Sequence, residues 1–129
     1  MTQRSSFLTA AGVALALAIG AASIQATTAN RLTYLTFSGP VGLPGVTLPG
    51  GSYAFELADP LAASNLVVVR NRARTQVYFL GFTERVPRPR SMRDGSTVTF
   101  GEAASGAAQP ISVWYPPDSA DGLQFIYRR

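Results

Sequence analysis

The sequence predicts an all-β protein: a small antiparallel β-sandwich, Ig-like, of about seven strands, with a small barrel as the alternative. Short runs of β-branched and aromatic residues recur at intervals of roughly 8–15 residues after residue 30. Turn-forming pairs of Gly, Pro and Asp separate these runs. No segment after residue 30 has a helical pattern that would supply the crossover connections of a parallel sheet.

The N-terminal segment has the pattern of a signal peptide. Arg4 precedes an uncharged stretch of 18 residues, 7–24, and small residues at Ala26 and Ala29 follow it. Those small residues fit the rule for signal peptidase, so we expect a signal helix that is cleaved after Ala26 or Ala29.

Two alternatives compete with a cleaved signal. A retained membrane helix needs a longer and more apolar stretch, and seven of the 18 residues in 7–24 are Ala and two are Gly. A twin-arginine signal needs a second Arg beside Arg4. We therefore expect residues 1–29 to be the signal peptide and residues 30–129 to form a single domain, exported to the periplasm or the cell exterior.

The first half of the domain contains the clearest strand. Tyr53, Phe55 and Leu57 alternate with small or polar residues, which is the period of a half-buried strand. The stretch 39–45 is rich in Gly and Pro and is predicted to be a turn region. The strands predicted in this half are 32–37, 46–48 and 52–57.

The second half begins with a buried strand and a hairpin. Residues 71–74 form the predicted tip, and Gly81 in the returning strand indicates a bulge or a close approach of backbone. A proline-containing loop then ends at Asp94-Gly95, and Pro116-Pro117 ends a later strand. The strands predicted in this half are 66–69, 75–83, 97–100, 111–115 and 123–127.

Composition excludes several kinds of chemistry. The chain has no Cys and no His, which removes disulfides, thiol nucleophiles, imidazole bases and the usual ligands of transition metals. We expect no cofactor and no metal centre. All eleven basic side chains are Arg, which indicates either selection for bidentate binding of anions or a bias of the genome.

Arginines cluster in one stretch of the sequence. Seven of them lie within the 24 residues 70–93, which contain one Glu, and one Asp follows directly at position 94. If they converge, they form a site for lipid phosphate or an acidic glycan, and binding should weaken with salt. The alternative is a solvated sheet edge whose charges prevent edge pairing. The candidate anion-binding residues are Arg70, Arg72, Arg74, Arg85, Arg88, Arg90 and Arg93.

Two further candidates have simpler explanations. Trp114, with nearby aromatic residues, is a possible contact for a sugar ring, but such rings more often form sandwich core. Asp118 and Asp121 are the best-placed pair of carboxylates for hydrolysis or calcium binding. Turn formation accounts for both of them, and two carboxylates fall short of a calcium site.

Three segments of the chain resemble one group of proteins. Residues 48–57, LPGGSYAFEL, are similar to the LPAGTYxFxL segment of small secreted bacterial β-sandwich proteins of uncharacterised function. Residues 36–41 resemble their opening strand, and 113–116 with 122–127 resemble their closing W-[FY]-P and G-x-x-F-x-Y motifs. The resemblance implies export and a sandwich fold, and it carries over no functional residues.

The sequence therefore predicts an exported protein that is not an enzyme, with a structural or partner-binding role in the cell envelope. The alternative is an anion-binding module that uses the arginines. Expected partners are an envelope protein or an anionic envelope polymer, not nucleic acid. We expect contact with a membrane only through an uncleaved signal segment.

Overall fold

The computed structural model describes residues 30–92 and 97–128, and within these ranges every regular element is a β-strand. The nine strands form one mixed sheet in the order β1-β4-β5-β6-β9-β8-β2-β3, and β7 pairs with β8. The sheet ends at β1 and β3, so it is not a closed barrel. The all-β class predicted from the sequence is confirmed, whereas the predicted signal helix lies outside the described residues.

The strands have the following bounds: β1 Thr33–Phe37, β2 Val41–Leu43, β3 Val46–Leu48, β4 Gly51–Asp59, β5 Ala63–Asn71, β6 Val77–Pro87, β7 Thr97–Phe100, β8 Gln109–Tyr115 and β9 Asp121–Phe125.

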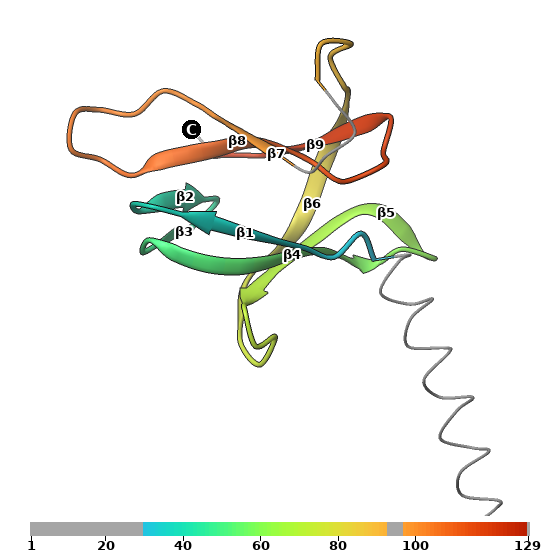
Figure 1. Ribbon diagram of the computed structural model, residues 1–129, viewed down its shortest axis with the longest axis horizontal. Coiled ribbons are helices and arrows are strands. Elements are labelled where there is room, and N and C mark those ends of the chain that lie inside the picture. The colour runs from blue at the N-terminus through green and yellow to red at the C-terminus, as the bar shows by residue number, and fades with distance from the viewer. Residues whose placement is uncertain (1–29, 93–96, 129) are drawn as a thin grey trace, which may run out of the picture.

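Strand β6 joins two halves of the sheet. Its residues 77–82 pair with β5, and its residues 83–87 pair with β9. In Figure 1, β6 runs from the layer of β1, β4 and β5 to the layer of β7, β8 and β9. The sheet is therefore folded over along β6, and its two halves enclose the core.

Aromatic contacts join the two layers. The largest fully buried side chains include Phe55 from β4 and Trp114 from β8, each 0% exposed. Burial of such rings is the main favourable term in folding a small domain. The pairs that link the layers, with their ring-centroid distances, are Phe55–Trp114 at 5.8 Å, Phe79–Phe125 at 5.5 Å and Phe37–Phe100 at 6.2 Å.

The structure corrects two details of the predicted strands. The stretch 39–45 is not only a turn, because β2 lies inside it and forms a hairpin with β3 around Gly45, whose φ is 78°. The sheet is also not wholly antiparallel, since Val41 and Gly42 pair in parallel with Gln109 and Pro110 of β8. Strands β3 to β7 connect β2 to β8 along the chain, so this parallel pair needs no crossover helix.

The structure shows neither of the two features predicted at Gly81, a bulge or a close approach of backbone, because the near neighbour of Gly81 is a side chain. A Cβ at Gly81 would lie 2.7 Å from Cζ of Phe79, so the missing side chain leaves room for that ring. The irregular register in this hairpin falls instead between Val69 and Arg70. Gly81 therefore lets Phe79 turn inward and contact Phe125.

A pair of side chains holds the point where β6 leaves β5. Thr83 is 2% exposed, and its hydroxyl donates to the carbonyl of Asn65 at 2.8 Å. The amide of Asn65 donates in return to the carbonyl of Thr83, also at 2.8 Å. These two bonds lie just beyond the last backbone pair between the strands, Leu66 with Phe82. They continue the connection where the backbone ladder stops.

We expect Thr83→Val to lower the free energy of unfolding by about 1–3 kcal/mol, because it leaves the partly buried carbonyl of Asn65 without its donor. Denaturant unfolding measures the effect. The matched control is Thr47→Val at an exposed position of β3, which should change stability by less than about 0.5 kcal/mol. Equal effects of the two substitutions would contradict the role of Thr83.

The hydroxyl of Tyr127 links the segment after β9 to the two next strands of the sheet, β8 and β2. It lies 2.7 Å from the carbonyl oxygen of Ile111 and 3.0 Å from that of Gly42. Burial raises the pKa of Tyr127 to about 12 from the ordinary value of 10.0. The folded state therefore holds this proton more tightly than the unfolded state does.

Stability from this proton is fully present below pH 10 and is lost as the pH rises through about 12, because the folded-state pKa is the higher one. We expect Tyr127→Phe to reduce the loss of stability over this interval, measured by denaturant unfolding at increasing pH. Tyr53, whose pKa is also raised by burial, contributes a remaining loss in both proteins. An unchanged pH profile in the variant would contradict this assignment.

Candidate functional site

The arginines predicted as one anion site fall into two groups at opposite ends of β6. One group lies at the end of β5 and in the following hairpin, and the other lies in the last part of β6 and the loop after it. Figure 1 shows the hairpin, in yellow-green, and the loop, in orange, pointing away from each other. Val77, which pairs with Arg70, lies eight residues before Arg85 in β6, a distance of about 26 Å along the strand at roughly 3.3 Å a residue.

The first group is Arg70, Arg72 and Arg74, and the second is Arg85, Arg88 and Arg90. Arg93 lies outside the described residues. The described arginines therefore do not converge on one site.

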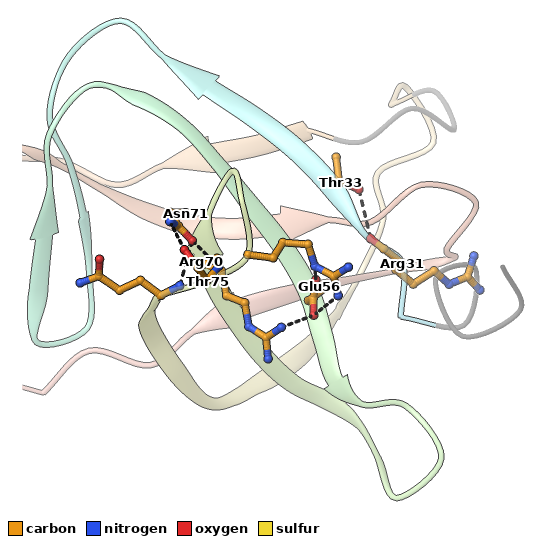
Figure 2. Close-up of polar contacts among 8 residues, drawn as sticks. Arg31, Thr33, Glu56, Arg70, Asn71 and Thr75 are labelled. Carbon is orange, nitrogen blue, oxygen red and sulfur yellow. Dashed lines mark hydrogen bonds and ion pairs between the residues drawn. The ribbon is translucent and has the colours of Figure 1, made fainter. Parts of the chain in front are cut away.

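Two arginines of the first group bind a buried carboxylate. Glu56 of β4 is 2% exposed. Its Oε1 accepts a hydrogen bond from Nη2 of Arg74 at 3.1 Å and lies 3.4 Å from Nη1 of Arg70. Its Oε2 lies 3.0 Å from Nε of Arg74. Figure 2 shows both guanidinium groups directed at Glu56, so part of their charge is neutralised inside the molecule.

Asn71 fixes the turn that brings Arg74 back to Glu56. Its side-chain oxygen accepts from the backbone N–H of Thr75 at 2.8 Å and of Gln76 at 2.9 Å, contacts that Figure 2 draws. Its backbone carbonyl accepts from the N–H of Arg74 at 2.9 Å, and Arg74 has a φ of 59°. Asn is favoured in turns because its side chain can make such local bonds.

Arg72 occupies the tip of this hairpin and is exposed. Its guanidinium lies over the ring of Tyr34 in β1, 5.0 Å from the ring centroid, which is within the range of a cation–π interaction. Within the described part of the chain no carboxylate forms an ion pair with Arg72. Its charge therefore faces solvent in a defined position.

The second group lies beside carboxylates and carbonyls. Arg85 and Asp121 line a cavity of about 350 Å³ together with Arg31, whose Nη1 donates to the carbonyl of Pro117 at 3.0 Å. Arg88 donates to the carbonyl of Pro116 and lies 5.7 Å from the ring centroid of Tyr115.

Arg88 and Arg90 also line a shallow recess that includes Asp118. These positions mix both signs of charge, and the hydrogen-bonding groups of Arg31 and Arg88 already contact the protein. The second group therefore does not form a patch of one sign.

A row of exposed apolar side chains was not anticipated from the sequence. In β6, Val77, Leu80 and Phe82 are 50%, 59% and 62% exposed. Leu80 pairs with Val68 and Phe82 with Leu66, so these side chains share the side of the sheet turned away from the core. We call this surface the outer β5–β6 face; its members are Leu66, Val68, Val77, Leu80 and Phe82.

The sequence contained a weak signal for this face. The run from Tyr78 to Phe82 is almost continuously apolar, which is typical of a strand buried on both sides. In the structure only one side is covered, where Phe79 packs against Phe125. The other side has no covering layer among the described strands.

Trp114 lies in the core. It is 0% exposed and packs against Phe55, so its ring is not presented at the surface. This placement matches the interpretation of Trp114 as sandwich core. A ligand could contact the ring only if the two layers separated.

The carboxylates predicted as a possible pair line different hollows. Asp121 borders the cavity beside Arg85, and Asp118 borders the recess beside Arg90. Asp118 has a φ of 56°, as expected for a turn residue. Within residues 30–92 and 97–128, no three or more Asp and Glu residues gather where they could hold a metal ion.

Comparison with protein-family models, with curated proteins and with solved structures gave no match. The resemblance to small secreted β-sandwich proteins stays a prediction. In the described ranges no helix is long and apolar enough to cross a membrane.

We expect Glu56→Gln to lower the free energy of unfolding by about 1–3 kcal/mol, because it removes the charge that Arg70 and Arg74 share. The side chains of Arg70 and Arg74 are 31% and 35% exposed, which keeps the loss below that of a fully buried pair. Thermal and denaturant unfolding measure the change. Glu102→Gln, at an exposed loop position, is the matched control, and an equally small effect of both substitutions would count against the ion cluster.

Proposed function

We propose that this protein is an exported, non-catalytic β-sandwich of the cell envelope that works by binding a partner through the outer β5–β6 face. The observation that carries the proposal is the exposure of Val77, Leu80 and Phe82 on one side of a strand whose other side is core. Exposure of these apolar side chains to water does not stabilise the fold. Contiguous exposed apolar patches mark binding sites on soluble proteins.

The neighbouring strands add to this argument. Leu66 is partly exposed and Val68 is buried, and both lie beside the exposed residues in the register of β5 and β6. The exposed apolar surface therefore reaches β5 only at Leu66, and Val68 lies covered beneath it. A surface of this kind suits a macromolecular partner better than a small ligand, because pockets for small ligands are concave.

The support for export and for the sandwich class comes from different sources. Two layers joined by inward aromatic pairs support a sandwich, with the mixed pairing of β2 and β8 as a local departure. Export rests on the pattern of residues 1–29 and on the resemblance to small secreted proteins. The alternative of one anion site made by seven arginines has less support, because the described members lie at two ends of β6.

The test uses the full chain with a C-terminal tag and cell envelopes isolated from the bacterium that carries the gene. We expect the double variant Leu80→Ser, Phe82→Ser to lose most of the binding, about tenfold or more, because it removes two large apolar side chains. Sedimentation of the envelopes with bound protein gives the measurement. Both positions are more than half exposed, so stability should change little.

Ile126→Ser is the matched control, since Ile126 is 51% exposed but follows β9 in the other layer. It should bind envelopes as the unaltered protein does. Binding that is equal in the double variant and the unaltered protein would overturn the proposed function.

A further inference from the structure

We propose that the partner of the outer β5–β6 face is an anionic lipid surface, with Leu80 and Phe82 entering the apolar layer and the hairpin arginines binding phosphate. This inference rests on the proposed function and names its partner. It extends the expected membrane contact from the N-terminal segment to the folded domain.

The first argument is position. Arg70 pairs with Val77 across β5 and β6, and Val68 pairs with both Glu56 and Leu80. Residues that are paired across antiparallel strands project on the same side of the sheet. The ion cluster and the exposed apolar side chains therefore lie on one face.

The second argument is charge. Arg70, Arg72 and Arg74 border the hairpin end of this face, where Glu56 is the carboxylate that pairs with Arg70 and Arg74, so this end carries a net positive charge. The exposed carboxylate of Glu84 lies at the other end, beyond Phe82. The whole chain has a formal net charge of +4. A basic border beside apolar side chains is complementary to an anionic membrane surface, where headgroups lie directly above the hydrocarbon.

The third argument is shape. The cavity beside Arg85, the recess beside Arg90 and the hollow lined by Phe37 and Phe100 include no residue of the outer β5–β6 face. Leu80 and Phe82 thus project from a surface where none of these hollows lies. Projecting apolar side chains enter a lipid layer readily, whereas a small anion needs an enclosing site.

The fourth argument is the orientation of Arg72. Stacking on Tyr34 fixes its guanidinium near the hairpin tip, and the rigid turn around Asn71 supports that position. A guanidinium offers a planar set of donors that binds phosphate in a bidentate manner. An acidic glycan would use the arginines as well but would gain nothing from Leu80 and Phe82, which is why we favour lipid.

The experiment measures binding of the full chain to two kinds of vesicle, phosphatidylcholine alone and phosphatidylcholine mixed with phosphatidylglycerol. We expect binding to the mixed vesicles at low salt, weaker binding at high salt, and little binding to phosphatidylcholine alone. Leu80→Ser, Phe82→Ser should weaken binding about tenfold or more. Arg72→Gln should weaken it about fivefold.

Matched controls separate this face from general attraction between opposite charges. Arg90→Gln removes the same charge at the other end of β6, and Ile126→Ser removes an exposed apolar side chain from the other layer. Both should bind mixed vesicles as the unaltered protein does. Residues 1–29 are in the same state, present or cleaved, in every variant. Differences in vesicle binding among the variants therefore report on the outer β5–β6 face. Equal losses in Arg72→Gln and Arg90→Gln would overturn the assignment to this face.

A second measurement reports entry into the lipid. In Leu80→Trp, the added indole should shift its emission to shorter wavelength with mixed vesicles and be quenched by brominated lipid. Trp114 is fully buried and serves as the constant background in the unaltered protein. Binding without any such change would exclude insertion of this face and overturn the inference.

The two proposals fail in distinguishable ways. If vesicles do not bind but the Leu80, Phe82 double variant still loses binding to envelopes, the lipid inference is overturned and the face binds a protein or a second copy of this chain. If the double variant binds both envelopes and mixed vesicles as well as the unaltered protein does, both proposals are overturned.

Discussion

The divided pairing of β6 is the constraint on which the rest of this structure depends. One strand completes the ladder of β5 and then begins the ladder of β9, with Thr83 at the change of partner. The two halves of the sheet must therefore face each other, and the inward side chains of both halves become core. The same geometry turns the outward side chains in the first half of β6 to solvent without a covering layer. Core and exposed face thus have a common origin in one strand.

A buried carboxylate organises the outward side of the same region. Glu56 lies on the face that would ordinarily be solvated, and the hairpin after β5 curls back so that Arg74 reaches it. Burial of a charge is costly unless opposite charges and hydrogen bonds accompany it. The alternating arginines are thus partly a structural device. The side chains of Arg70 and Arg74 also stay about one third exposed, so they remain partly in contact with solvent.

The sequence predicted the fold class because alternation is a local property: Tyr53, Phe55 and Leu57 are buried as their spacing indicates. The half-buried strand predicted there is wrong, since Ala54 and Glu56 on the other face are buried too. It did not predict β2, since a three-residue strand among Gly and Pro has no pattern of its own. Convergence of the arginines depends on where the hairpin and the later loop point, which is fixed by β6 as a whole. The exposure of Leu80 could not be predicted either, because a continuous apolar run does not indicate which side of the strand lacks a covering layer.

The parallel pairing of β2 with β8 also bears on the order in which the domain can assemble. The contact joins Val41 of β2 to Gln109 of β8, so β2 cannot complete its pairing before β8 has been synthesised. The final two strands also supply Trp114 and Phe125 to the centre. Long-range contacts of this kind slow folding, because the loop between them must be closed first. The core between the two layers is therefore completed only after β8 and β9 have been synthesised, because these strands supply Trp114 and Phe125.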